Sequence, residues 1–303
     1  MKKALFFSLL FCTTIVFSQQ KTTSASDVSQ SLTKKSEMMK SSLVKNVDFT
    51  NIGPTVMSGR VADVSVNPNN TTEFYVGYAS GGLWYTNNNG TSFTPVADNA
   101  PTQNMGDIAV DWNSGTIWVG TGESNSSRSS YSGIGILKSS DKGKTWTNVG
   151  LPNSQHIGRI IINPNNPDDV TVAAVGNLYT SSSDRGIYKT TDGGKTWKNV
   201  LFINDGTGAI DLSVSPTNPN VIFAAMWERE RKAWDFDGDG ENSGIYKSTD
   251  GGNTWTNMTP EGSGFPTGTG VGRIGVSVFN DNVIYALLDN QFRRPAGAQR
   301  TTQ

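Results

Sequence analysis

The sequence predicts an all-β fold, a β-propeller of four-stranded antiparallel blades with four complete blades and a partial fifth. Two observations predict it. One motif, Ser/Thr-x-Asp-x-Gly-x-Thr-Trp, occurs three times intact and once in degraded form, at intervals of about 50 residues. Short β-rich runs precede each copy and are separated by residues typical of turns. Four strands for each repeat of this length are typical of a propeller blade.

The repeated motif, called the box here, has the chemistry of a hairpin turn. Its Asp can accept hydrogen bonds from turn amides, its Gly adopts a conformation that a Cβ would penalise, and its Trp can anchor one blade on the next. Because the box recurs in each of the four complete blades, whereas a catalytic group is usually needed once, we expect these residues to be structural rather than catalytic or metal-binding. The residues are Asp141, Trp146, Asp192, Trp197, Asp250 and Trp255, and the degraded copy spans residues 86–93.

The remaining strands follow in chain order. The first two strands of each blade are predicted at 61–68 and 74–78, 106–111 and 116–120, 158–164 and 170–174, 209–216 and 221–225, and 272–278 and 283–287. The third strands are predicted at 82–85, 135–138, 186–189 and 244–247, each leading into a box. The fifth blade therefore has two strands and no box.

The two ends of the chain differ from the repeats. Residues 1–18 have two lysines followed by an apolar run too short to span a bilayer, which predicts a signal peptide and a secreted or cell-surface protein. Residues 19–46 read as a flexible tether, 47–288 as the propeller and 289–303 as an irregular tail. We expect a truncated chain from a longer parent with further C-terminal domains; the alternative is a small five-bladed ring with one defective blade. Residues 49–54 resemble 146–152, so they are predicted to add an outer strand that closes the ring.

Composition excludes several function classes. Lys+Arg 25 against Asp+Glu 26 disfavours nucleic acid as the main partner, and no segment after the signal peptide is apolar enough to span a membrane. The single Cys lies in the predicted signal peptide, so disulfides and thiol chemistry are not expected. The single His, His156, has no Gly-x-Ser-x-Gly elbow to serve, which disfavours a Ser-His-Asp triad.

One equivalent position on the innermost strands carries charge in four of the five blades. It is occupied by Asp63, Asp107, Arg159 and Asp211, and then by Gly275. In a propeller these side chains lie at the mouth of the central channel, where they could bind a cation, pair with one another or do acid–base work on a sugar. The candidate catalytic carboxylates are thus these three Asp residues and Glu123 of a nearby loop, with Arg159 as a ligand contact.

The irregular loops lie on the same face as that mouth, and long varied loops on a rigid scaffold commonly carry function. Trp227, Trp234 and Tyr131 could stack on sugars or anchor a protein partner, or else cover the loop cores. Calcium is the one candidate cofactor. Asp235, Asp237, Asp239 and Glu241 approximate the spacing of a calcium loop, although its twelfth position is Tyr246 instead of Glu; the alternative is a solvated acidic turn.

The boxes resemble the Asp-box (BNR) repeats of sialidases, family-74 glycoside hydrolases and sortilin-type receptors. The chain is most similar to secreted bacterial proteins described as sortilin-N-terminal-like or glycosyl-hydrolase-like. This similarity rests on residues 52–54, 59–60, 79–84, 119–123 and 155–159. The resemblance covers about 47–288 and implies a propeller. The catalytic Asp of family 74 precedes a Gly-Gly pair, but here Ala79-Ser80 precede Gly81-Gly82; the early Arg-Ile-Pro of sialidases is also missing.

The sequence therefore predicts a binding module for an extracellular protein, peptide or glycan, acting through the irregular loop face. The alternative is a glycoside hydrolase, sialidase-like or family-74-like, that uses the carboxylates at the channel mouth. Substitution separates the two: hydrolysis needs one of the carboxylates, whereas binding needs the aromatic side chains.

Overall fold

The computed structural model describes residues 23–47 and 59–292. The predicted signal peptide at 1–18 and the predicted ring-closing strand at 49–54 lie outside the described residues.

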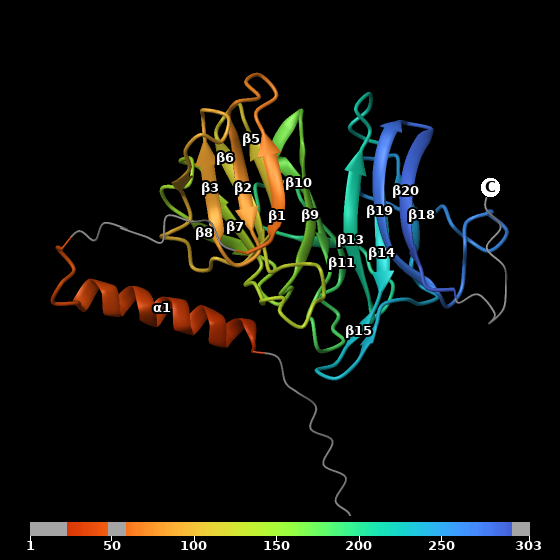
Figure 1. Cartoon of the computed structure of the whole chain (residues 1–303), viewed down its shortest axis with the longest axis horizontal. Helices are drawn as coiled ribbons and strands as arrows, with labels where there is room; N and C mark the ends of the chain where they lie inside the picture. The colour runs from red at the N-terminus through yellow and green to blue at the C-terminus, as the bar shows by residue number, and fades with distance from the viewer. Residues whose placement is uncertain (1–22, 48–58, 293–303) are drawn as a thin grey trace, which may run out of the picture.

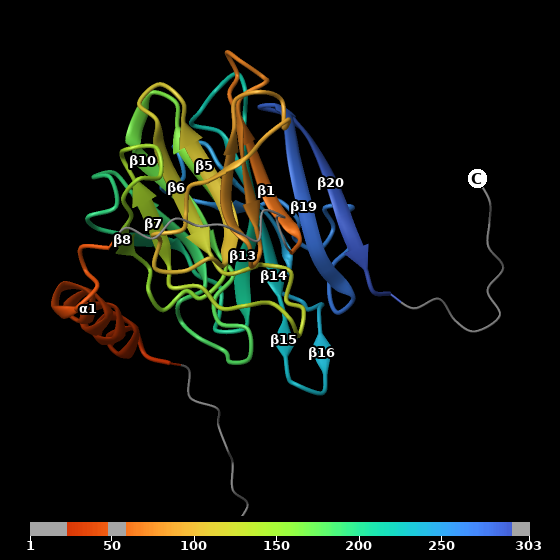
Figure 2. The same ribbon diagram turned by 60° about the vertical axis from the view of Figure 1, so that its left-hand side comes forward.

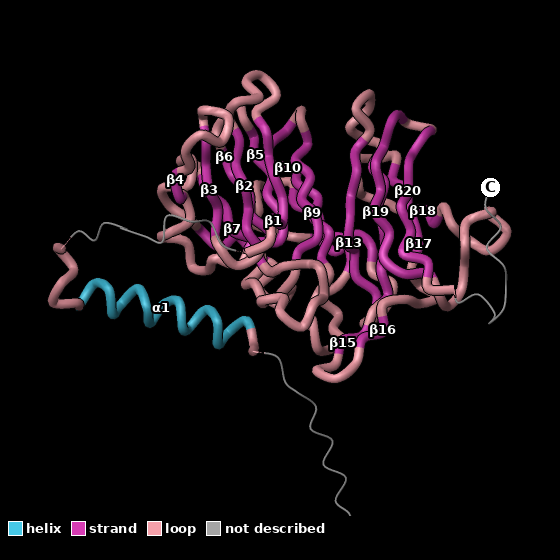
Figure 3. The backbone as a smooth tube through the Cα atoms, viewed as in Figure 1, coloured by secondary structure: helices cyan, strands magenta, loops and turns pink. Residues whose placement is uncertain are grey.

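The described residues confirm the predicted all-β propeller fold (Figure 1). Four antiparallel four-stranded sheets form four blades, and a further two-stranded sheet packs against the fourth blade (Figure 3). The first blade is β1 (Val61–Val66), β2 (Phe74–Tyr78), β3 (Gly82–Thr86) and β4 (Thr94–Pro95), and the second is β5 (Met105–Asp111), β6 (Thr116–Thr121), β7 (Ile136–Ser139) and β8 (Thr147–Gly150). The third is β9 (Ile157–Asn163), β10 (Asn166–Ala174), β11 (Gly186–Thr190) and β12 (Lys198–Leu201). The fourth is β13 (Thr207–Val214), β14 (Ile222–Glu228), β17 (Gly244–Ser248) and β18 (Thr256–Asn257), and the last sheet is β19 (Val271–Asn280) and β20 (Val283–Asn290).

The hydrophobic core lies between consecutive blades. Each inner strand contacts the next, in the order β1, β5, β9, β13 and β19. Apolar side chains of neighbouring blades interdigitate there: Leu83 with Met105 between the first two blades, and Trp118 with Ile157 between the second and third. Burial of this kind contributes about 25 cal/mol per Å² of apolar surface. The blades thus form a rigid support for the loops at either end of the strands.

The box turns pin the outer hairpin of each blade. In the second blade the Asp141 carboxylate accepts bonds from the Thr145 N–H at 2.9 Å, the Thr145 hydroxyl at 2.6 Å and the Ser139 hydroxyl at 2.7 Å. Gly143 adopts a φ of 88°, which a Cβ would penalise. Trp146 donates its Nε1–H to the Val96 carbonyl of the preceding blade at 3.0 Å. The turn therefore joins two blades as well as two strands.

Acid should weaken these turns in a defined pH range. The hydrogen bonds from Thr145 lower the pKa of Asp141 to about 2, and equivalent bonds from Thr196 lower the pKa of Asp192. A carboxyl with a lowered folded-state pKa contributes full stability above its unfolded pKa near 4. That contribution is lost as the pH falls towards 2. We expect the urea midpoint to drop between pH 4 and pH 2, and to drop less in Asp141→Asn, which is already weaker at pH 7. An equal pH dependence in both proteins would contradict this account.

Part of the segment predicted as a flexible tether forms a helix. Helix α1 spans Ala25–Ser41, and the Ser24 hydroxyl accepts the Asp27 N–H at 3.1 Å as its N-cap. No residue of α1 is buried, and it lies beside the blades in Figure 2. Its content of Lys, Met and Gln, which favour helices, explains why a polar segment is ordered locally. Within the described residues, α1 falls short of the length and apolarity needed to cross a membrane.

Candidate functional site

The inner strands turn their charged residues to the axis by a repeated irregularity. In β1, β5 and β13 the strand register shifts just before Asp63, Asp107 and Asp211. In the third blade the shift falls just before Arg159, between Ile157 and Arg159. A bulge bends its strand and re-aims the side chain that follows. The four charged side chains therefore meet at one place although they come from four separate blades.

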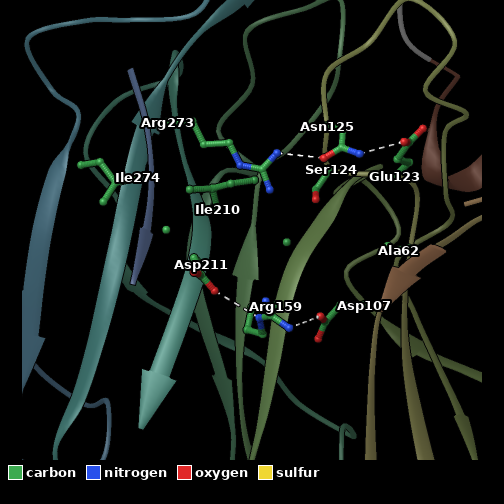
Figure 4. Close-up of a pocket in the computed structure, with 13 residues that line it drawn as sticks. Ala62, Asp107, Glu123, Ser124, Asn125, Arg159, Ile210, Asp211, Arg273 and Ile274 are labelled. Carbon is green, nitrogen blue, oxygen red and sulfur yellow. Dashed lines mark hydrogen bonds and ion pairs between the residues drawn. The ribbon is translucent and has the colours of Figure 1, made fainter. Parts of the chain in front are cut away.

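Arg159 is the centre of this cluster. Its guanidinium lies 3.0 Å from Asp107, 3.1 Å from Asp211 and 3.4 Å from Asp63, as Figure 4 shows for the first two. Burial acts to lower the pKa of Arg159, but the three carboxylates outweigh it and raise the pKa above its ordinary value. Burial raises the pKa of Asp107 well above normal and that of Asp63 to a lesser degree, with Arg159 opposing in both cases. One permanent cation thus holds three carboxylates together.

The same carboxylates also bind the backbone of the next blade. Asp63 accepts the Ile108 N–H at 3.2 Å, Asp107 the Ile160 N–H at 2.7 Å, and Asp211 the Val276 N–H at 2.9 Å. In every case the second oxygen of the carboxylate faces Arg159. Both oxygens of each Asp are therefore engaged in contacts between blades, and the same contact recurs at three blade interfaces.

Glycine permits this close approach of the blades. A Cβ on Gly158 would overlap the backbone of Ile210, and a Cβ on Gly106 would overlap the carbonyls of Gly122 and Ile157. Both glycines directly precede a member of the axial cluster, the group formed by Arg159 and its three carboxylates Asp63, Asp107 and Asp211. The Gly-Arg-Ile sequence at 158–160 is thus explained by packing against the next blade.

A second group of polar side chains is linked by hydrogen bonds near the axial cluster. Arg60 binds both oxygens of Glu123, one through Nε at 2.6 Å. Asn125 donates to Glu123 at 3.0 Å and accepts from Arg273 at 2.9 Å. Burial acts to raise the pKa of Glu123, but the bonds from Arg60 and Asn125 outweigh it and hold the pKa below normal. Glu123 is therefore an ionised acceptor and a poor proton donor.

A pocket of about 100 Å³ lies between the two groups (Figure 4). Its lining includes four of the residues that sequence analysis selected, Asp107, Glu123, Arg159 and Asp211, together with Ser124, Asn125 and Arg273. Sequence analysis missed Arg60, Asn125 and Arg273 as site residues. The signal for Arg273 was present, because the Gly-Arg-Ile sequence recurs at 272–274. No comparable pattern marks Asn125.

His156 supports the loop that carries Glu123. It is 1% exposed, and its Nδ1 lies 2.8 Å from the Glu123 carbonyl oxygen. Burial, reinforced by the nearby Arg229, lowers the pKa of His156 to about 4, so the ring is neutral at pH 7. A neutral ring donates from Nδ1 to the carbonyl. His156 thus supports the backbone of Glu123 and does not line the pocket.

The predicted aromatic contacts differ in exposure. Trp227 is buried at 3% exposure and donates its Nε1–H to the Gly238 carbonyl at 2.7 Å, so its placement as a ligand contact is corrected to the loop core. Trp234 is 84% exposed on the loop between β15 (Glu230–Arg231) and β16 (Phe236–Asp237), a hairpin that projects from the blades in Figure 2. Tyr131 is 55% and Tyr179 40% exposed. These three exposed rings come from the loops between the second and third strands of three consecutive blades.

The predicted calcium loop does not gather its side chains. Among the described residues no group of three or more His, Cys, Asp or Glu side chains is placed to hold a metal ion. Asp235 accepts the N–H of Phe236 at 2.9 Å, and Asp239 accepts the N–H of Gly270 at 2.6 Å. The Asp235 and Asp239 carboxylates thus bind backbone N–H groups of two different segments. Calcium binding stays a prediction, which melting with calcium and with chelator tests.

Comparison with known proteins gives matches of two kinds. The family model described as "Sortilin, neurotensin receptor 3" matches residues 135–279. An ancestral enzyme of glycoside hydrolase family 74 superposes with a TM-score of 0.56 at 20% identity, covering 77% of this chain and 29% of the enzyme. A family-74 enzyme of Niastella koreensis gives 0.52 at 24% identity, covering 75% and 36%. The chain is a propeller resembling sortilin-like and glycoside-hydrolase-like proteins.

The relatives found by sequence are xyloglucanases and a vacuolar protein sorting/targeting protein. A probable oligoxyloglucan-reducing end-specific xyloglucanase of Neosartorya fischeri is 29% identical over 140 residues, which are 42% of this chain and 15% of that protein. A xyloglucanase of Acetivibrio thermocellus is 31% identical over 139 residues, 40% of this chain and 15% of the enzyme. The vacuolar protein sorting/targeting protein 10 of Kluyveromyces lactis is 30% identical over 86 residues, 27% and 5%. The matched part is thus a small share of much longer proteins.

Proposed function

We propose that this protein is a secreted binding module that holds an extracellular glycan on the face formed by its irregular loops. The three exposed rings Tyr131, Tyr179 and Trp234 carry the proposal, because each projects from the corresponding loop of a successive blade. Exposed aromatic rings on a rigid support stack on sugar faces at little conformational cost. Relatives named as xyloglucanases support a glycan over a peptide as the ligand.

Hydrolysis is the second candidate function, and the xyloglucanase relatives favour it. A glycosidase pairs a carboxylic acid that donates a proton with a second carboxylate. Asp107, whose pKa burial raises, is the one carboxyl in the pocket suited to donate. Its oxygens, however, face Arg159 and the Ile160 N–H. Engagement of the axial carboxylates in blade contacts supports binding as the first candidate.

A glycan-binding assay with a hydrolysis readout tests the proposal. Titration calorimetry with xyloglucan oligosaccharides should detect binding, and chromatography of the same mixtures should show no shorter products. Removing one stacking ring costs about 1 kcal/mol or more, so Trp234→Ala and Tyr131→Ala should weaken binding by about 5-fold or more each.

Phe279→Ala is the matched control, because Phe279 is a 64% exposed aromatic ring at the far end of β19. It should bind like the parent protein. Shorter products that disappear in Asp107→Asn would establish the hydrolase instead. Equal losses in Phe279→Ala and Trp234→Ala would contradict a site on the irregular face.

A further inference from the structure

Arg273 is the least engaged arginine in the pocket. Within the described part of the chain, no carboxylate lies within ion-pair distance of it, and its one hydrogen-bond partner is the neutral Asn125 oxygen at 2.9 Å. The ring of Trp227 lies 5.8 Å from the guanidinium and covers it on one side. A guanidinium has five N–H donors in a planar fork. Most of the donor capacity of Arg273 is therefore free beside the pocket.

Three other arginines of the described residues have more hydrogen-bond partners than Arg273. Arg159 holds three carboxylates, and Arg60 holds both oxygens of Glu123. Arg185, which is 2% exposed, donates to four backbone carbonyls. Half-buried Arg273 has lost part of its hydration without such partners. Charged groups removed from water are usually paired, which indicates that a partner arrives with the ligand.

We propose that Arg273 binds the carboxylate of an acidic sugar unit, with Asn125 and Ser124 as neutral polar contacts. This inference deepens the proposed function and rests on it. A carboxylate matches the guanidinium fork in two parallel hydrogen bonds. The pocket, at about 100 Å³, is far smaller than a site for a whole ligand and admits one group. The three carboxylates that line it, those of Asp107, Glu123 and Asp211, repel a doubly charged phosphate ester more strongly than a single carboxylate.

The second group of polar side chains positions Arg273 for this contact. Arg60 holds Glu123, Glu123 orients the Asn125 amide, and Asn125 directs its oxygen to Arg273. Figure 4 shows Arg273 and Asn125 on one side of the pocket and Arg159 with Asp107 on the other. The oxygens of Asp107 and Asp211 accept hydrogen bonds from Arg159 and from backbone N–H groups. They are therefore already engaged and do not pair with Arg273. The fork of Arg273 is thus held in place before a ligand binds.

The test compares acidic oligosaccharides with their own methyl esters. Calorimetry of the full chain uses galacturonate, glucuronate and mannuronate oligomers of four to six units, each as free acid and as ester. At least one acid should bind about 10- to 100-fold more tightly than its ester, as expected for a charge-assisted hydrogen-bonded pair. Arg273→Gln should remove that preference, Arg273→Lys should keep part of it, and salt should weaken it.

Arg128→Gln is the matched control, because Arg128 is exposed on the same side of the molecule and the substitution removes the same charge. It should keep the preference for the acid. The inference is overturned if every ester binds as well as its acid, if no acid binds, or if Arg273→Gln changes nothing at an unchanged melting temperature. Binding of a peptide through its terminal carboxylate, lost in Arg273→Gln, overturns the sugar assignment. Binding of neutral xyloglucan oligosaccharides that needs Trp234 and not Arg273 leaves the proposed function standing without this inference.

Discussion

Arg159→Gln should destabilise the protein by about 2–3 kcal/mol at pH 7. The substitution leaves Asp107, 2% exposed, together with Asp63 and Asp211, without their shared cation. Breaking a buried ion pair costs about 3–5 kcal/mol. We expect a loss at or below the lower end of this range, because the Arg159 side chain is 39% exposed and water partly replaces it. Urea unfolding followed by circular dichroism measures the loss.

The same variant should show a characteristic pH dependence. Without Arg159, burial raises the pKa of Asp107 and Asp63 further above normal. An acid whose folded-state pKa is raised stabilises the fold below its unfolded pKa near 4, and that stability is lost as the pH rises through the folded pKa. The deficit should therefore be smaller at pH 4 than at pH 7. The double variant Arg159→Gln with Asp107→Asn should recover part of the stability that Arg159→Gln loses at pH 7. An equal deficit at both values would show that the charge cluster is not the cause.

Trp118→Ala should cost about 3–5 kcal/mol, a larger loss than any surface substitution can cause. Trp118 in β6 is fully buried between the second and third blades. Its ring meets Trp197 edge-on at 6.4 Å between centroids, and the Lys138 ammonium lies 4.4 Å from its centroid. Removing it leaves a cavity that two rigid sheets cannot collapse to fill. Equilibrium unfolding in urea measures the change in midpoint.

Two variants separate packing from other effects of Trp118. Among the described residues its Nε1 has no hydrogen-bond partner, so Trp118→Phe should lose only volume and retain most of the stability. Trp234→Ala removes the same side chain at 84% exposure and should change stability by no more than about 0.5 kcal/mol. Similar losses in Trp118→Ala and Trp234→Ala would rule out interblade packing as the reason.

The repeat made the fold predictable. Every box found in the sequence forms a hairpin turn, and every predicted strand pair forms in the described residues, because turn chemistry and strand alternation are local properties. Repetition also supplied long-range information, since equivalent positions in a propeller converge on one axis. That is why Asp63, Asp107, Arg159 and Asp211 could be grouped from their equivalent places in the repeat.

The blades, the turns and the members of the axial cluster could thus be predicted from the repeat. The packing of separate blades sets how their charges are used, since it brings Asp107 to Arg159 and to the Ile160 N–H. It also buried Trp227 while leaving Trp234 exposed, and it brought Asn125 to Arg273 across 148 positions of sequence. The physical reason is that irregular loops have no period. Their contacts depend on which blade lies next to which, and spacing along the chain does not encode that.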